Sequence, residues 1–224
     1  MSEPNRNSTV LIRIASAAVL IPVVLAAVHF GTPYFQALVV IGVLILFKEL
    51  FQVTAGARRR FLWCASGTVY IVMAAAALIW IRQGITFGDI IIYYLFVVVW
   101  VSDSGAYLFG RMIGGAKLAP RISPKKTWAG LIGGVALAAL AGVAVGAYFD
   151  SSAPLESALY GALLGAVAQG GDLLESWVKR HFGVKDSGAI IPGHGGLFDR
   201  VDGLLAASIA MIVILTLEKG RQSL

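Results

Sequence analysis

The sequence predicts an all-α fold, a polytopic membrane bundle of about seven transmembrane helices. Hydrophobic residues make up 58% of the 224 residues and charged residues only 13%, whereas soluble domains carry roughly 25% charged residues. The mean hydropathy is +0.82. Apolar runs of about 20 residues, the length of a helix that crosses the hydrocarbon core of a bilayer, recur along the chain. We therefore expect one membrane domain over residues 1–224.

The apolar runs place the expected helices in order. The first, at 10–30, is interrupted only by Arg13 and has no convincing small-residue cleavage site, so we interpret it as a retained helix and not as a signal peptide. The last, at 203–218, is the shortest. The full set of expected helices is 10–30, 34–52, 61–81, 87–109, 127–149, 155–174 and 203–218.

The basic residues indicate how the helices are oriented. If the N-terminus is cytoplasmic, only Arg82, Lys219 and Arg221 of the 18 lysines and arginines fall on the far side. The positive-inside rule predicts this asymmetry, and an odd helix count then places the C-terminus outside. We attribute the net charge of +6 to this orientation and to anionic lipid or nucleotide phosphate, and expect no nucleic acid as partner. Cys64, the one cysteine, is expected to pack in its apolar run.

A first polar segment, "SDSGAYLFGRMIGG", places Asp103 near the inner end of the fourth expected helix. A carboxylate at membrane depth is costly and usually faces a protein interior with a partner. Arg111 follows about two helical turns later. A buried ion pair, a carboxylate that reaches the interface and a part in a functional site all stay open for Asp103.

A second segment, "RISPKKTWAG", combines a helix-start signal with two lysines. Pro124 would suit the first turn of a helix and Ser123 its cap, which brings Lys125 and Lys126 beside free backbone N–H groups. This arrangement is suited to phosphate. A cap followed by two positive-inside lysines explains the same residues equally well.

A third segment, "GDLLESWVKRHFGVKDSGAIIPGHGGLFDRVDG", concentrates ionisable residues. In its first part, four polar residues are spaced i, i+3, i+4 and i+7, so they would lie on one face of a helix: Asp172, Glu175, Ser176 and Lys179. Asp199 and Asp202, three residues apart, can project together if a helix has begun at Leu197. Four carboxylates can then converge: those of Asp172, Glu175, Asp199 and Asp202, with Ser176 and Lys179 on the face of the first two.

Convergent carboxylates suit a hard cation such as Mg²⁺, which takes oxygen ligands together with water and substrate phosphates. Lys179, Arg180, Lys185 and Arg200 flank the acids and would hold the phosphates. An exposed salt bridge for Lys179 or Arg180, or a helix cap for Asp186, would explain single residues. Their density at the membrane boundary favours a functional site. The glycines around His194 allow backbone to approach a ligand, while His194 itself stays ambiguous.

At these residues the chain resembles the phosphatidate cytidylyltransferase family, the CDP-diacylglycerol synthases. "SDSGAYLFGR" and "ISPKKTW" are similar to upstream segments of that family, so the resemblance covers Val101 to Gly203; Ala129 departs from the polar or acidic residue of many relatives. The first three helices are similar only in hydropathy. The matching residues are Ser176, Lys179, Arg180, Lys185, Asp186, Gly188, Pro192, His194, Gly195, Gly196, Asp199, Arg200 and Asp202.

The resemblance implies a nucleotidyltransferase of phospholipid biosynthesis that forms CDP-diacylglycerol and pyrophosphate from CTP and phosphatidic acid and requires Mg²⁺, with a second cation open. On that basis the catalytic residues are Asp172, Lys179, Asp199, Asp202, Lys125 and Lys126. The substrate-binding residues are Ser123, Lys125, Lys126, Arg180, Lys185, Asp186, His194, Arg200 and Asp103. The metal ligands are Asp172, Asp199, Asp202 and Glu175.

The same basis divides the membrane domain into N-terminal transmembrane helices at 10–100, catalytic segments at 101–203 and a last helix with tail at 204–224. The active site is expected to face the cytoplasm from a bacterial inner membrane, and a homodimer stays open. A CTP-dependent polyprenol or phytol kinase is one alternative, although an uncharged alcohol needs a base and fewer lysines. A cation-coupled transporter is another, but the charges gather on one side and no inverted repeat is visible.

Overall fold

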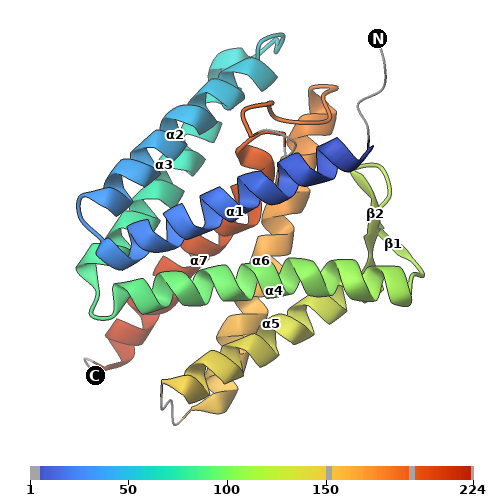
Figure 1. Cartoon of the computed structure of the whole chain (residues 1–224). Helices are drawn as coiled ribbons and strands as arrows, with labels where there is room; N and C mark the ends of the chain where they lie inside the picture. Colours follow the sequence, from blue (N-terminus) through green and yellow to red (C-terminus); the bar gives the residue numbers. More distant parts are fainter. Residues whose placement is uncertain (1–5, 150–152, 192–194, 223–224) are drawn as a thin grey trace.

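The computed structural model describes residues 6–149, 153–191 and 195–222, which form seven helices and one small antiparallel sheet (Figure 1). The seven expected apolar runs correspond to the seven helices, so the predicted helical class is confirmed. In chain order the elements are α1 (Arg6–Phe30), α2 (Tyr34–Val53), α3 (Arg60–Gly84), α4 (Gly88–Met112), β1 (Lys117–Ala119), β2 (Ser123–Thr127), α5 (Trp128–Tyr148), α6 (Pro154–His181) and α7 (Phe198–Gln222).

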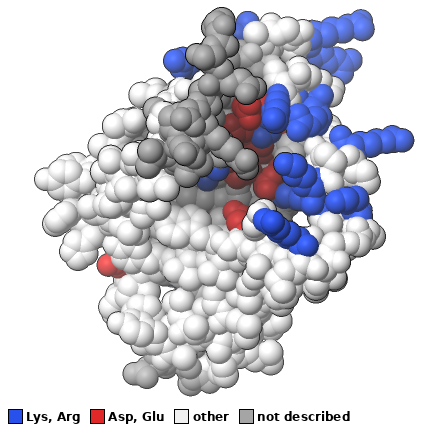
Figure 2. Space-filling model, turned by 45° about the vertical axis from the view of Figure 1, so that its right-hand side comes forward, with Lys and Arg blue, Asp and Glu red and all other residues white. Residues whose placement is uncertain are grey.

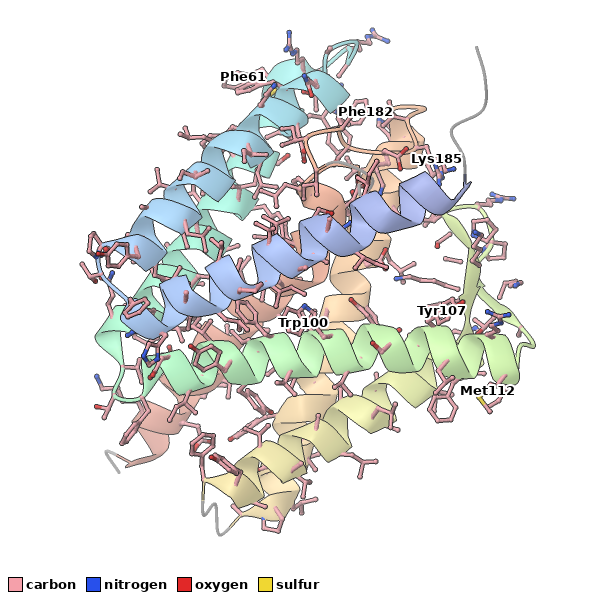
Figure 3. The ribbon with its side chains drawn as sticks, in the orientation of Figure 1. Phe61, Trp100, Tyr107, Met112, Phe182 and Lys185 are labelled. Atoms are coloured by element: carbon pink, nitrogen blue, oxygen red, sulfur yellow. The ribbon has the colours of Figure 1, made fainter. Side chains whose placement is uncertain are left out.

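Within the described residues, five helices are long and apolar enough to cross a membrane: α2, α3, α4, α5 and α7. Helix α1 has a shorter apolar stretch, Ile14–Phe30, and α6 carries charged residues in its last turns. Large apolar side chains cover the outer faces of the bundle, as Phe61 and Met112 illustrate (Figure 3). The chain is therefore a polytopic helical membrane protein, in which lipid takes the place of water around the helices.

Helices α4, α5 and α6 pack closely because glycines line their contacts. A Cβ atom added at Gly161 of α6 would lie 2.3 Å from the carbonyl oxygen of Ala138 in α5. One added at Gly134 of α5 would lie 2.6 Å from the carbonyl oxygen of Ser102 in α4. Small residues let helix backbones approach in this way in lipid, where apolar burial does not drive helices together.

Helix α7 lies between this group and the α2–α3 pair (Figure 1). On one side, Ala207 and Met211 of α7 belong to the core cluster built around α4 and α6. On the other, Leu205 joins a second cluster with Leu50 of α2 and Ile71 of α3. The first turns of α7 are thus held between two packed surfaces, which fixes the direction of the polar side chains at its start.

The predicted helix start at Ser123 and Pro124 was wrong, although the expected helix at 127–149 agrees with α5. Both residues lie in β2, which pairs antiparallel with β1. Thr127 caps α5 instead: its backbone is extended and its Oγ1 accepts a hydrogen bond of 3.0 Å from the N–H of Gly130. Pro is tolerated in an edge strand because its missing N–H is not needed there.

The ends of α6 and α7 extend beyond their apolar runs. Helix α6 continues past residue 174 to His181, where Gly183 adopts a left-handed conformation (φ +68°) and the Val184 N–H donates to the Lys179 carbonyl. This is a common way for a helix to end. Helix α7 is 25 residues long and begins at Phe198 instead of 203, so the last helix is not the shortest. Both extensions place charged residues on helices.

Candidate functional site

Charged side chains gather on one face of the molecule. Figure 2 shows lysines and arginines along the border of a hollow in which aspartates and glutamates lie. The contacts that follow divide the predicted acidic residues into two neighbouring clusters. Each cluster is centred on one lysine.

The first is the Lys126 cluster, which consists of Lys126, Asp172, Asp103 and Asp202. Lys126 of β2 lies with its Nζ 2.7 Å from Oδ2 of Asp172 in α6. Asp103 of α4 and Asp202 of α7 interact electrostatically with both Asp172 and Lys126. Four segments far apart in the sequence therefore contribute to one cluster, and the prediction of Asp103 beside the other acids is consistent with this placement.

The two predicted lysines of β2 lie in different environments. Successive side chains of a strand point to opposite faces. Lys126 is turned inward to Asp172, with 21% of its side chain exposed, while Lys125 is exposed. The structure thus brings Lys126 into the site and leaves Lys125 at its border.

Gln169 supports the Lys126 cluster from within α6 and was missed from the sequence. It is buried, its backbone carbonyl accepts a hydrogen bond from Lys126 Nζ at 3.4 Å, and its side-chain amide donates to Oγ of Ser102 at 3.1 Å. Its signal was present: it is a lone amide in the apolar run "GALLGAVAQGG". A buried polar side chain in such a run needs hydrogen-bond partners.

The second is the Lys179 cluster, which consists of Lys179, Glu175 and Asp199. The ammonium of Lys179 lies 2.5 Å from Oε2 of Glu175, one turn earlier in α6, and 2.6 Å from Oδ1 of Asp199 in α7. The predicted helical spacing of Glu175 and Lys179 is confirmed. Asp199 accepts further hydrogen bonds from the loop that precedes α7, donated by the backbone N–H and hydroxyl of Ser187 and by the N–H of Gly196.

The two α6 members of this cluster titrate abnormally. Burial, and to a lesser degree the neighbouring Asp199 carboxylate, raise the pKa of Glu175 to about 8, although the Lys179 ammonium opposes this shift. Burial lowers the pKa of Lys179, but its hydrogen bonds to Asp199 and Glu175 outweigh burial and raise the pKa above its ordinary value. Lys179 is therefore held as a cation, which is the form that neutralises phosphate.

The predicted convergence of four carboxylates on one point is not seen. Asp172 and Asp202 belong to the Lys126 cluster, whereas Glu175 and Asp199 belong to the Lys179 cluster. Within the described residues, no three acidic, histidine or cysteine side chains are placed to hold one metal ion. Asp172 is ion-paired to Lys126, whereas Glu175 and Asp199 are ion-paired to Lys179.

The donor set still fits a hard cation in charge and chemistry. The Lys126 cluster has three carboxyl groups against one ammonium, and oxygen ligands are those that Mg²⁺ prefers. In the Lys179 cluster, Oε1 of Glu175 is buried and, in the part of the chain that is described, has no hydrogen-bond partner. Asp199 fits less well, because its carboxylate already accepts from the Lys179 ammonium and from the backbone N–H groups of Ser187 and Gly196.

The other predicted residues surround the clusters. Arg180 joins α6 to the β1–β2 turn by donating to the Ile122 carbonyl at 3.4 Å, and to Val184 at 3.0 Å. Ser176 donates to Oδ1 of Asp172 at 3.3 Å. Ser123 is half-buried in β2, while Lys185, Asp186 and Arg200 are exposed. His194 lies outside the described residues, so its predicted role has no structural counterpart here.

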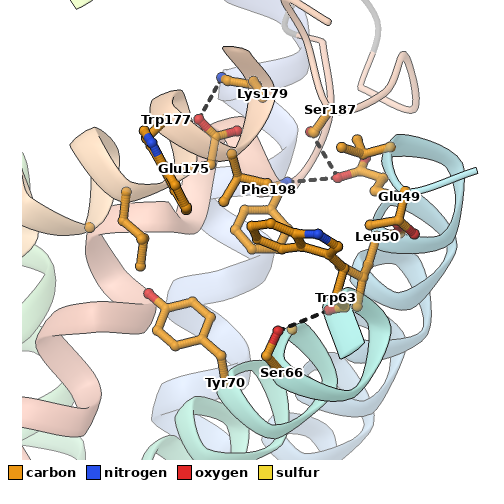
Figure 4. Close-up of a pocket in the computed structure, with 16 residues that line it drawn as sticks. Glu49, Leu50, Trp63, Ser66, Tyr70, Glu175, Trp177, Lys179, Ser187 and Phe198 are labelled. Atoms are coloured by element: carbon orange, nitrogen blue, oxygen red, sulfur yellow. Dashed lines mark hydrogen bonds and ion pairs between the residues drawn. The ribbon is translucent and has the colours of Figure 1, made fainter. Parts of the chain in front are cut away.

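A pocket of about 240 Å³ adjoins the Lys179 cluster, between α2, α3, α6 and α7 (Figure 4). Glu175 and Lys179 lie at its polar end, and apolar side chains such as Trp63, Tyr70 and Trp177 form most of its wall. The charged end of the helix bundle is therefore continuous with an apolar space.

This fold and these clusters define a class of protein, a polytopic helical membrane protein with two lysine–carboxylate clusters and a basic border at one end of its helices. The chain belongs to the cytidylyltransferase family, whose sequence model matches residues 58–217. The match includes both clusters in full.

Individual relatives agree with the family. The chain is similar to a protein of Brucella suis named phosphatidate cytidylyltransferase, with 46% identity over 172 residues that cover 77% of this chain but 63% of the relative. The chain thus spans less than two thirds of that relative's length. A protein of the same name from Rickettsia bellii is 32% identical over 221 residues, covering 96% of this chain and 94% of the relative. One from Staphylococcus aureus is 49% identical over 115 residues, covering 51% and 44%.

Proposed function

We propose that this chain transfers the cytidylyl group of CTP to phosphatidic acid, forming CDP-diacylglycerol and releasing pyrophosphate. Membership of the cytidylyltransferase family and the names of its relatives support the reaction class. The observation that carries the proposal is the pair of lysines, Lys126 and Lys179, each ion-paired to carboxylates at the charged end of a membrane protein. A water-soluble nucleotide and a lipid headgroup can meet there.

The reaction requires charge neutralisation more than it requires a protein nucleophile. A phosphatidate oxygen attacks the α-phosphorus of CTP, the bond from that phosphorus to the bridging oxygen breaks, and pyrophosphate leaves. Transfers of this kind depend on positioning and electrostatic stabilisation. No general base is needed because phosphatidate is already anionic near neutral pH. Two polyanions must nevertheless approach one another closely, which fixed ammonium groups make possible.

The lysines of the two clusters supply these fixed ammonium groups. Lys179, held between Glu175 and Asp199, neutralises the triphosphate or the departing pyrophosphate, assisted by Arg180, Lys185 and Arg200 at the border. Lys126 and Ser123 face the phosphatidate headgroup or the nucleotide from β2. The apolar pocket beside Lys179 suits the lipid side of the reaction, since ligand sites combine apolar walls with a few polar groups.

Asp172 and Asp202, with Asp103, are the groups of the Lys126 cluster that would hold Mg²⁺, and Glu175 of the Lys179 cluster would offer its Oε1, unpaired among the described residues, to a second cation. The ion would supply neutralisation of the phosphate charge when bound. Asp199 serves instead to fix Lys179, because its carboxylate is already engaged by that ammonium and by the backbone N–H groups of Ser187 and Gly196. This divides the predicted metal ligands into those available to a cation and one that is committed to the protein.

We further propose that the N-terminus and the charged end face the cytoplasm, in a bacterial inner membrane. The gathering of basic side chains at one end supports this orientation (Figure 2). In a Cys64→Ala background, a cysteine placed at Lys117 should react with a membrane-impermeant maleimide in inside-out vesicles and not in intact cells. The opposite pattern would reverse the orientation.

The experiment that tests the function is a product analysis with the purified chain in vesicles that contain phosphatidate, supplied with CTP and Mg²⁺. We expect pyrophosphate and a cytidine-containing lipid in equal amounts. Release of CDP with phosphorylation of a polyprenol would indicate the kinase. Cation flux across the vesicles without nucleotide would indicate a transporter.

A further inference from the structure

Glu49, near the end of α2, has a fully buried carboxylate that binds the segment leading into α7 (Figure 4). Its Oε1 accepts a hydrogen bond of 2.8 Å from the N–H of Leu197. Its Oε2 accepts one of 2.8 Å from the N–H of Phe198 and lies 3.1 Å from Oγ of Ser187, which donates to it. Both carboxylate oxygens are thus committed to a segment that lies 138 to 149 residues away in the chain.

Donors from the backbone compensate the burial of this charge. Among the ion pairs formed within the described residues, none includes Glu49. A buried carboxylate without such a partner is costly unless several donors bind it. Leu197 and Phe198 supply N–H groups that have no helical partner, since they lie at the N-terminus of α7, and the helix dipole there favours a negative charge.

Two glycines leave the space that this carboxylate occupies. A Cβ added at Gly188 would lie 2.8 Å from Oε1 of Glu49. One added at Gly196 would lie 2.9 Å from the same oxygen and 2.0 Å from Oγ of Ser187. A side chain at either position would displace Glu49 or Ser187. The lack of a side chain at Gly188 of "DSG" and Gly196 of "HGG" therefore leaves room for the Glu49 carboxylate.

From Glu49 a continuous set of polar contacts reaches the Lys179 cluster. The Ser187 hydroxyl lies 3.1 Å from Oε2 of Glu49 and 3.1 Å from Oδ2 of Asp199. Because a hydroxyl has one proton, it donates to one carboxylate at a time, while the Ser187 N–H continues to hold Asp199 at 3.1 Å. Asp199 in turn lies 2.6 Å from the ammonium of Lys179.

We propose that Glu49 is a positioning residue for cytidylyl transfer, which acts on Lys179 through Ser187 and Asp199. Glu49 connects α2 to Ser187, in the loop between α6 and α7 (called the Ser187 loop below), and to the first turn of α7. Asp199 would then hold Lys179 in one orientation toward the nucleotide phosphates. This inference rests on the proposed function. Glu49 lies outside the residues 58–217 that match the family, so the contact adds a residue from the N-terminal helices to the site.

The test compares Glu49→Gln with Glu49→Asp in lipid nanodiscs. Glutamine keeps the size of the side chain but turns an NH₂ group toward backbone or hydroxyl donors, so at least one of the buried hydrogen bonds is lost. Hydrogen exchange of the peptide spanning 195–200 should quicken about 10-fold, as expected for one lost bond. The KM for CTP should rise about 10-fold while the KM for phosphatidate changes less than about twofold. Glu49→Asp should recover part of both effects.

Two further variants separate positioning from general destabilisation. Ser187→Ala should raise the KM for CTP, and its effect combined with Glu49→Gln should be smaller than the sum, because both act through one chain of contacts. Ser208→Ala, which removes a buried hydroxyl within α7 whose partners are carbonyls, should leave both KM values unchanged. If Glu49→Gln fails to fold, Glu49→Asp and Ser187→Ala still decide the matter.

Unchanged exchange and an unchanged KM for CTP in Glu49→Gln would overturn the proposal, as would an equal rise of both KM values, which a merely structural role predicts. The exchange measurement needs no turnover. If the wild-type chain transfers no cytidylyl group, the proposed function fails, and exchange still reports whether Glu49 holds the Ser187 loop.

Discussion

The ammonium nitrogen of Lys126 lies 2.7 Å from Oδ2 of Asp172 and joins the β1–β2 hairpin to α6. The neighbouring Lys125, which carries the same charge on the same strand, is exposed on the other face. These two lysines form a matched pair of positions, one inside the site and one at its border. Their comparison separates local positive charge from a placed ammonium group.

We predict that Lys126→Ala lowers kcat/KM for cytidylyl transfer about 100-fold, the loss typical of one fixed electrostatic contact to a transition state. Lys125→Ala should lower it about twofold, as expected for an exposed residue. Steady-state kinetics with CTP and phosphatidate varied in turn provide the measurement. Equal losses of kcat/KM in the two variants would show that Lys126, paired with Asp172, contributes no more to the reaction than the exposed Lys125.

The carboxylates should respond differently to magnesium. Asp172→Asn and Asp202→Asn should raise the Mg²⁺ concentration required for half-maximal turnover, because both side chains lie in the cluster with excess negative charge. Asp199→Asn should instead reduce turnover at every Mg²⁺ concentration, because it releases Lys179. Titration of activity with Mg²⁺ distinguishes the two. If Asp199→Asn alone shifted the titration, Asp199 would be the ligand and the Lys126 cluster would not.

Removal of Lys179 should destabilise the fold as well as abolish activity. Lys179→Met leaves the carboxyl groups of Glu175 and Asp199 without their shared cation, and breaking a buried pair in this way costs about 3 kcal/mol. Arg180→Met, at the next position, removes a more exposed charge and should cost less than about 1 kcal/mol. Unfolding of the purified variants measures both. Similar stabilities would mean that Lys179 contributes nothing to the fold.

Glu175 should give the fold a specific pH dependence. Burial is the main cause that raises its pKa from 4.5 to about 8. A carboxyl group that holds its proton more tightly when folded stabilises the fold fully below the unfolded pKa, and this stabilisation is lost as pH rises through the folded pKa. The unfolding temperature of the wild-type chain should therefore fall more steeply than that of Glu175→Gln between pH 4.5 and 8. Parallel pH profiles would show that folding does not raise the pKa of Glu175.

The helices could be predicted because apolar length alone identifies them, but the charged end of α6 and the start of α7 could not. The expected limits 155–174 and 203–218 describe the apolar parts of α6 and α7. Hydrogen bonds carry α6 on to His181, and Glu49 accepts from the first N–H groups of α7. A hydropathy pattern contains neither effect.

The site could be predicted only where its contacts are local. The spacing of Glu175 and Lys179 indicated their ion pair, since residues four apart meet on a helix. The ion pair of Lys126 with Asp172 depends on the β1–β2 hairpin. The sequence did not indicate this hairpin, because Pro124 is typical of a helix start. Glu49 lay in a helix that resembled the family only in hydropathy, so no local pattern set it apart.

The central claim, that this chain transfers the cytidylyl group of CTP, is tested most directly by position-labelled nucleotide. Purified protein in phosphatidate vesicles would be given Mg²⁺ and CTP labelled with ³²P either at the α-phosphate or at the γ-phosphate. We predict that the lipid becomes labelled only from α-labelled CTP, and that γ-labelled CTP gives labelled pyrophosphate. Lipid labelled from the γ-position, or no labelled lipid from either, would contradict the claim.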